Sequence, residues 1–304
     1  MSLDRLLSYL CLLPLVFSGC NTSSAVSQSS GTVQAPPLTV GQNCPEGSDE
    51  LPKQFDGFAR EDTMCYAGYQ VARLFKKVRV EDYPRPVEVS YAVLKRDGKV
   101  LAEFDSKVYH PTGNATDFGL ISLLDGSFRQ LVVEQTLPRN WAHWIVDLSP
   151  DHRVIFDGGE WGVDRELRYM DVDGDGVHEI SQAVPAFTFF EGLTNATSHL
   201  IDVAFKYDPK AKKYLPANHV FQDYALRGIE DEISCLNRND EQKFSLGVLH
   251  VVLRYIYAGK EAEAWSFYER EYHRPDKAEL KSKIEARLRD EPVHKFIYRN
   301  GASR

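Results

Sequence analysis

The spacing of hydrophobic residues differs between two parts of the chain. Across residues 87–224, short runs of β-branched and aromatic residues recur roughly every ten positions, with Gly, Pro, Asn and Asp in the gaps, as in antiparallel sheet. From Glu241 onward the apolar positions follow the period of an amphipathic helix. We therefore predict an α+β protein. Its antiparallel β-rich domain, a sandwich or partial propeller-like sheets, spans 44–235, and a small helical domain spans 236–304.

The clearest local signal for a strand pair is Asp97-Gly98, which favours a two-residue hairpin turn. Folding about this turn places Val93 opposite Ala102. Further strands are predicted in six runs: RQLVVEQ, HWIVDLS, RVIFDGG, RELRYMDV, AFTFFEG and HLIDVAFKYDP. No clean repeat is visible, so a full closed propeller is not expected.

Three helices are predicted after Glu241. The first ends at Gly259, and EAEAWSFYEREY forms the second, which makes a helical hairpin. The third is PDKAELKSKIEARLRD, where Asp276 and Glu279 have the spacing of a capping box. Its buried stripe is expected to contain Leu280, Ile284 and Leu288.

The N-terminus reads as an export signal. Arg5 precedes an apolar run over 6–17, which small residues and Cys20 follow. The ending FSGC resembles the lipobox of bacterial lipoproteins, in which the cysteine becomes the lipid-modified first residue. The resemblance implies a signal peptide over 1–19, a lipid on Cys20 and a place in the bacterial cell envelope. Asn21 follows the cysteine, in place of the Asp that retains enteric lipoproteins at the inner membrane, and this implies the outer membrane.

Residues 20–43 are dominated by Ser, Thr, Gln, Gly and Pro and have little apolar surface to bury. They are predicted to be a flexible tether between the lipid and the folded part.

Charge narrows the class of partner. The chain has a net charge of −8, and the part from Glu241 onward has 13 basic and 10 acidic residues, which leaves −11 for the part before it. An acidic body argues against nucleic acid as a partner and is compatible with cations.

Three cysteines remain after removal of Cys11 with the signal and lipidation of Cys20. Outside the cytoplasm one pair of these can form a disulfide. Cys44 with Cys65 is the favoured pair, because both flank the entry to the folded part, and Cys65 with Cys235 is the alternative.

The segment MDVDGDGVHEI at 170–180 concentrates negative charge. Asp171, Asp173 and Asp175 alternate, Val177 offers a backbone carbonyl, and Glu179 follows. Ca²⁺ binds six to eight oxygen ligands, and glycines between the acids permit the tight backbone that this requires. The sequence predicts a Ca²⁺ loop over 171–179, and a solvated acidic turn is the alternative.

The loop is similar to the calcium loop of FG-GAP and VCBS repeats, which links two strands in integrin-type propellers. The resemblance implies side-chain ligands at Asp171, Asp173, Asp175 and Glu179 and a carbonyl ligand at Val177. Only one copy is present, whereas propellers carry several. An EF-hand fits poorly, since its twelfth position is Gln182 and the flanks read as strands.

No common catalytic motif was found in the sequence. A candidate contact surface for a protein or glycan is formed by the cluster Trp141, His143, Trp144 and Trp161. The first hypothesis is a non-enzymatic binding or structural module with structural calcium. The alternative is an envelope hydrolase acting on glycan or peptide, in which His143 or His152 should meet a carboxylate in an apolar cleft.

Overall fold

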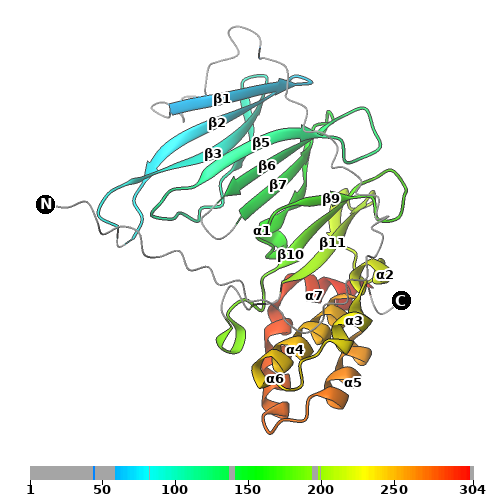
Figure 1. The fold of residues 1–304 in the computed structure, drawn as a ribbon. Helices are drawn as coiled ribbons and strands as arrows, with labels where there is room; N and C mark the ends of the chain where they lie inside the picture. Colours follow the sequence, from blue (N-terminus) through cyan, green and yellow to red (C-terminus); the bar gives the residue numbers. More distant parts are fainter. Residues whose placement is uncertain are drawn as a thin grey trace, which may run out of the picture.

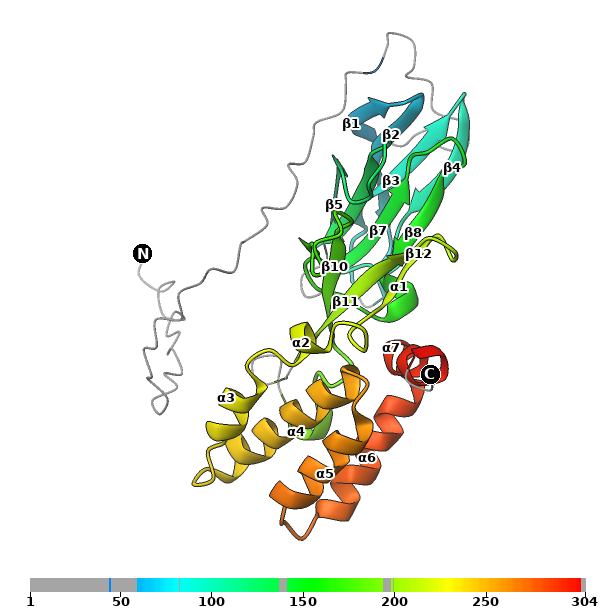
Figure 2. The same cartoon turned by 90° about the vertical axis from the view of Figure 1, so that its right-hand side faces the viewer.

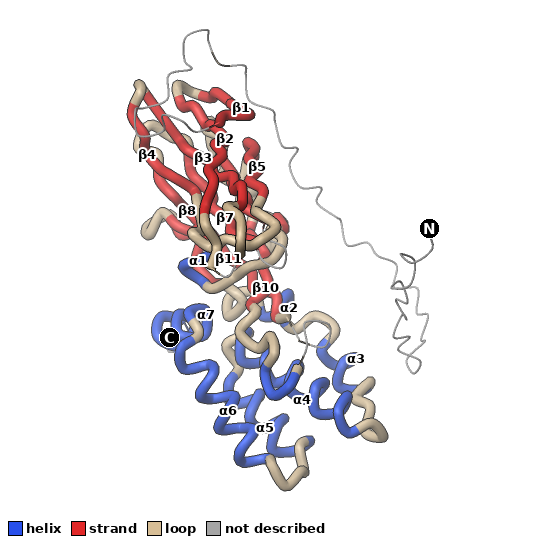
Figure 3. Tube along the Cα trace, turned by 90° about the vertical axis from the view of Figure 1, so that its left-hand side faces the viewer, coloured by secondary structure: helices blue, strands red, loops and turns tan. Residues whose placement is uncertain are grey.

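The computed structural model describes residues 44, 59–81, 83–136, 141–193, 198 and 200–301. The predicted signal peptide, Cys20 and the tether lie outside the described residues. In the described part, the strands gather at one end of an elongated molecule and most of the helices at the other (Figures 1 and 3). This arrangement confirms the predicted α+β fold class.

The first sheet is a four-stranded antiparallel meander. Its strands are β1 (Ala59–Tyr66), β2 (Tyr69–Val78), β3 (Val87–Arg96) and β4 (Lys99–Phe104), in the order β1-β2-β3-β4.

The predicted hairpin turn forms between β3 and β4. Asp97 and Gly98 both have positive φ, as a type I′ turn requires. The predicted register is wrong by one residue, because a shift next to Leu94 pairs Val93 with Glu103 instead of Ala102. Such a bulge accommodates one extra residue on one strand.

Two more antiparallel meanders follow along the chain. The second sheet contains β5 (Ala115–Ile121), β6 (Gln130–Thr136), β7 (Trp141–Asp147) and β8 (Arg153–Asp157). The third contains β9 (Arg168–Met170), β10 (Glu179–Val184), β11 (Ile201–Asp208) and β12 (Lys213–Pro216).

The second sheet is covered on both faces, and this explains its apolar composition. One face packs on the first sheet through alternating residues such as Leu131 and Val133. The intervening Val132 points the other way, into a core that includes Ile180 and Phe205 of the third sheet and continues into the helices. The period of two along a strand thus supplies both cores.

The helices pack at the end of the molecule near the third sheet (Figure 2). They are α1 (Gly158–Trp161), α2 (Gln222–Ala225), α3 (Ile229–Ser234), α4 (Glu241–Tyr257), α5 (Glu261–Glu271), α6 (Lys277–Asp290) and α7 (Pro292–Phe296), with the short turns η2 (Phe190–Gly192) and η3 (Ile297–Gly301). The three helices predicted from the sequence correspond to α4, α5 and α6, and α4 ends just before Gly259, whose φ is +78°.

Three details differ from the sequence predictions. The helical part begins at Gln222, earlier than the expected boundary at 236, because α3 packs on α4. Asp276 makes no side-chain cap on α6, and its carboxylate accepts a hydrogen bond from the Tyr272 hydroxyl instead. The run AFTFFEG is not a strand.

The AFTFFEG run consists of turns and η2, in which Phe189 and Glu191 adopt positive φ. It lies against α6, since Arg287 donates to the Ala186 carbonyl and Lys283 pairs with Glu191. A short aromatic run cannot by itself distinguish a strand from a loop that inserts rings into a core.

The predicted disulfide between Cys44 and Cys65 is formed, and Cys235 is a free, exposed thiol. Among the described residues, no helix combines the length and the apolar character needed to cross a membrane.

Candidate metal site

The acidic loop connects β9 to β10, which pair antiparallel with Glu179 opposite Met170. Its end is held from two sides: the His178 N–H donates to the Leu123 carbonyl, and the His178 carbonyl accepts from the Tyr214 hydroxyl. The loop therefore links two strands, as predicted, and its last acid sits at the start of a buried strand.

Asp171 organises the turn itself. Its Oδ1 accepts from the N–H groups of Gly174 and Asp175 at 2.8 and 3.1 Å, and its Oδ2 accepts from Gly176 at 3.2 Å. Gly174 and Gly176 have positive φ, which glycine adopts without steric cost. These contacts hold the Asp171 carboxylate inside the loop.

Glu179 is the deeply placed acid. Its side chain is fully buried, and its Oε2 accepts from the Val172 N–H at 2.8 Å. Its Oε1 accepts no hydrogen bond. Burial raises the pKa of Glu179, and the Val172 N–H and the Lys206 charge only partly counter that effect.

Asp171, Asp173 and Glu179 form a group that could hold a metal ion, because one oxygen of each lies within 4.8 Å of the others. Two oxygens on opposite sides of a bound Ca²⁺ are separated by roughly 5 Å, so this spacing fits such an ion. Asp175 does not belong to this group; its Oδ1 accepts from the Val177 N–H at 2.8 Å. The expected role of the Val177 carbonyl stays a prediction.

A lysine reaches into the same loop. The Lys206 ammonium contacts Asp173, lies 2.9 Å from Asp175 Oδ2 and lies 3.5 Å from Glu179 Oε1. Partial burial lowers the pKa of Lys206, but hydrogen bonds to the two aspartates outweigh burial and raise it above the ordinary value. The hydrogen bond from Lys206 also lowers the pKa of Asp175.

Lys206 offsets part of the repulsion in the loop. Four carboxylates and one ammonium leave a local charge of −3. Residues 173–176 are exposed, as in a solvated turn, but the loop also keeps a surplus of negative charge and the buried Glu179 Oε1, which accepts no hydrogen bond.

The contact of Lys206 with the loop was not predicted from the sequence. The β10–β11 pairing ends at Ile180 opposite Phe205, and one further step places Lys206 across from Glu179. Opposite charges facing each other across two strands would have been the signal, but it needs the register, which the sequence alone does not give.

The four residues of the predicted contact surface do not lie together on the outside, because two are in the interior, while Trp141 and Trp144 are half-buried. His143 is fully buried, and Trp161 is in the core against Phe205 and Phe296. Trp144 packs on Phe104 between the first two sheets. His143 and Trp144 are on β7, which belongs to the sheet that is covered on both faces, and Trp161 is the last residue of α1.

His143 does meet a carboxylate. Its Nε2 lies 2.7 Å from Glu134 Oε2 on the neighbouring strand, and its Nδ1 lies 2.9 Å from Nε2 of the buried Gln182 in the third sheet. The hydrogen bond from His143 lowers the pKa of Glu134. The Glu134 contact lies within the second sheet, and the Gln182 contact joins that sheet to the third. His152 packs on the Tyr69 ring.

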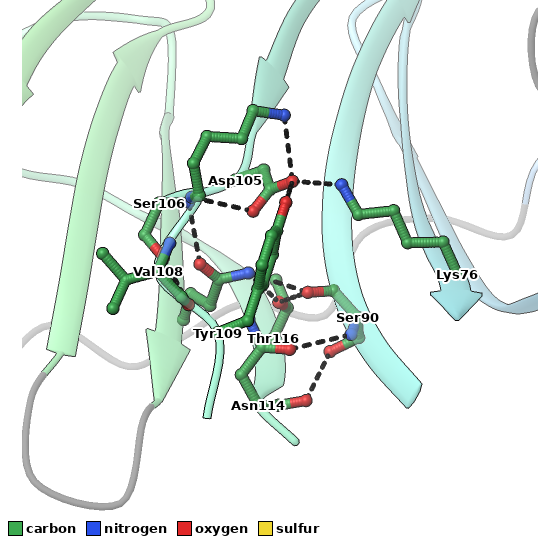
Figure 4. Close-up of polar contacts among 10 residues, drawn as sticks. Lys76, Ser90, Asp105, Ser106, Val108, Tyr109, Asn114 and Thr116 are labelled. Carbon is green, nitrogen blue, oxygen red and sulfur yellow. Dashed lines mark hydrogen bonds and ion pairs between the residues drawn. The ribbon is translucent and has the colours of Figure 1, made fainter. Parts of the chain in front are cut away.

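A second ion cluster lies on the first sheet and the loop after it (Figure 4). Asp105, whose side chain is 1% exposed, contacts Lys76 and accepts from Lys107 Nζ and the Tyr109 hydroxyl, each at 3.0 Å. Burial raises the pKa of Asp105, but the hydrogen bonds from the two lysines outweigh it and lower it to about 2. This carboxylate is fully supplied with donors.

Comparison with known proteins gives no relative: no family model matches the chain, and neither a curated protein nor a solved structure matches it.

Proposed function

We propose that the chain is a lipid-anchored protein of the bacterial envelope whose loop 171–179 binds Ca²⁺ as a structural ion. The protein would act as a non-enzymatic binding or structural module. The observation that carries the metal proposal is the Glu179 side chain, which is fully buried, has one oxygen that accepts no hydrogen bond, and groups with Asp171 and Asp173 as a candidate ligand. A buried carboxylate oxygen without a donor is costly, and a bound cation relieves that cost.

Calcium is the favoured ion because of the donor set. All the candidate ligands are oxygens, the loop is short and rich in glycine, and Ca²⁺ tolerates irregular oxygen coordination. Zn²⁺ binds preferentially to Cys and His in structural sites, and Mg²⁺ demands a near-octahedral arrangement. The resemblance to the FG-GAP and VCBS loop supports the same choice.

Calorimetric titration of the full-length protein in detergent tests the site. The wild type should bind one Ca²⁺ with measurable heat, and Asp173→Ala should abolish that heat. Asp117→Ala is the matched control, since Asp117 is an exposed acid on the second sheet, away from the loop. Equal heats for wild type and Asp173→Ala would remove the proposed site.

The anchor and the location rest on the lipobox resemblance at FSGC. We expect the wild type to fractionate with the outer membrane and to incorporate a labelled fatty acid. Cys20→Ala should lose the label and leave the membrane fraction. An unlabelled wild type would contradict the lipoprotein proposal without affecting the metal site.

We favour the binding module over the envelope hydrolase because the His143 imidazole is fully buried and faces Gln182. A protein or glycan partner in the envelope stays part of the proposal, without the aromatic surface that the sequence indicated. A cross-linking experiment on intact cells would identify a protein partner.

A further inference from the structure

We infer that Lys206 holds the position that a divalent cation takes in the acidic loop, so that the ion binds only by displacing this ammonium. Lys206 would then determine the affinity of the loop and its preference for divalent ions. The inference rests on the proposed metal site and adds a residue from a different strand to it.

The distances make the two cations exclusive. The ammonium contacts Asp173 and lies 2.9 Å from Asp175 and 3.5 Å from Glu179, at the meeting point of three carboxylates. A Ca²⁺ ion needs oxygens at roughly 2.3–2.6 Å, so an ion bound to Asp173 and Glu179 would overlap the ammonium or lie in repulsive contact with it.

The ammonium satisfies the loop incompletely. Glu179 Oε1 is buried and accepts no hydrogen bond, because the Lys206 nitrogen at 3.5 Å is too distant for one. Glu179 belongs to the same group of candidate ligands as Asp171 and Asp173, and Asp171 is not among the ion-pair partners of Lys206 found in the described structure. A metal ion would engage oxygens that the lysine leaves unused.

Lys206 has room to leave. Its side chain is 31% exposed, and its ammonium lies 5.4 Å from the centre of the Phe221 ring, which can attract a cation. The flexible four-carbon stem can therefore turn the charge into solvent while the strand stays in place.

The exchange favours divalent over monovalent ions. With Lys206 in the loop the local charge is −4 + 1 = −3, and a monovalent ion in its place gives the same −3. A divalent ion gives −4 + 2 = −2, so only a divalent ion reduces the repulsion among the carboxylates further. We therefore expect Na⁺ and K⁺ not to displace the Lys206 ammonium, because they gain no electrostatic advantage over it.

The test is a calorimetric titration with Ca²⁺ of three full-length proteins: the wild type, Lys206→Met and Lys213→Met. Methionine keeps the length and removes the competing charge. Lys213 is the matched control: it lies on β12 of the same sheet, pairs with Glu160 at 3.0 Å and changes the net charge equally. We expect Lys206→Met to lower the Kd for Ca²⁺ about tenfold or more, and Lys213→Met to change it less than about twofold.

Each outcome decides between the two proposals. If wild type binds and Lys206→Met binds equally or more weakly, the role of Lys206 is overturned and the metal site stands. If only Lys206→Met binds, the role of Lys206 stands and the native calcium site is overturned. If neither folded protein binds Ca²⁺, the metal site fails and the inference fails with it.

A measurement on the unmodified protein covers the case in which Lys206→Met does not fold. Amine acetylation followed by peptide mass spectrometry should label Lys206 several-fold faster with saturating Ca²⁺ than without it. Lys213 should show no change. Equal labelling of Lys206 in both conditions, in protein that binds Ca²⁺, would overturn displacement.

Discussion

Two clusters of carboxylates and lysines in the β-rich part differ in their ratio of hydrogen-bond donors to carboxylates. In the Asp105 cluster, one buried carboxylate receives two ammonium groups and a tyrosine hydroxyl. In the loop of 171–179, the Lys206 ammonium contacts three of the four carboxylates, and Glu179 Oε1 accepts no hydrogen bond. Both clusters combine carboxylates with lysine ammonium groups, but donors outnumber carboxylates around Asp105 and carboxylates outnumber ammonium groups around Lys206.

This difference separates a structural ion cluster from a candidate cation site. A carboxylate whose lone pairs are all occupied gains nothing from a metal ion, whereas a surplus of carboxylates around a buried oxygen does. Proximity of acidic residues in the sequence is therefore insufficient, because the decisive quantity is the number of donors that the fold brings to them.

The largest loss of unfolding free energy is expected from a mutation in the Asp105 cluster. Asp105→Ala should lower the free energy of unfolding by about 3 kcal/mol, because it leaves Lys76 without its partner in a half-buried position. Asp117→Ala, which removes an exposed partner of Arg73, should cost less than about 1 kcal/mol. Denaturant titration measures both, and equal losses would show that burial does not distinguish the two pairs.

The Asp105 cluster also predicts that the free energy of unfolding decreases at acidic pH. The pKa of Asp105 lies at about 2 in the folded protein, below the ordinary 3.8, so its ionised form stabilises the fold. That contribution, roughly 2 kcal/mol, should be complete above pH ~5 and be lost as the pH falls through about 4 toward 2. Asp105→Asn should lack this part of the pH dependence of unfolding, and an unchanged slope would contradict the assignment.

A smaller change in the free energy of unfolding is expected when Ca²⁺ binds to the loop of 171–179. At a free Ca²⁺ concentration ten times the Kd, the wild type should gain about 1.4 kcal/mol of stability by mass action. Glu179→Gln should gain less than about 0.3 kcal/mol, since the amide can still accept from Val172 but supplies no charge. Thermal unfolding with and without Ca²⁺ measures the gain, and a full gain in the variant would exclude Glu179 as a ligand.

The smallest loss of unfolding free energy is expected at the Glu134–His143 pair, which lies within the second sheet. Glu134→Gln should cost less than about 1 kcal/mol, because its amide oxygen can still accept from His143. The variant should also keep the full stabilisation by Ca²⁺, which makes it the control for Glu179→Gln. A loss above about 2 kcal/mol would mean that the charge of Glu134, and not its hydrogen bond, holds His143.

Local features were predictable from the sequence and long-range ones were not. The turn at Asp97-Gly98 and the helix ending before Gly259 depend on backbone preferences of the residues themselves. The bulge next to Leu94, the burial of His143 and the approach of Lys206 depend on register and on which sheet covers which. The acidic residues of the loop could be identified from the sequence, but the contact of Lys206 with them could not.

The most direct test of the central claim is the amount of calcium held by the protein. Full-length protein in detergent is dialysed against about 1 mM Ca²⁺, which is the weak end of extracellular affinities, and bound calcium is counted per chain. The account predicts close to one ion for the wild type and none above background for Asp173→Ala. A wild type with no bound calcium, or a variant with as much as the wild type, would contradict it.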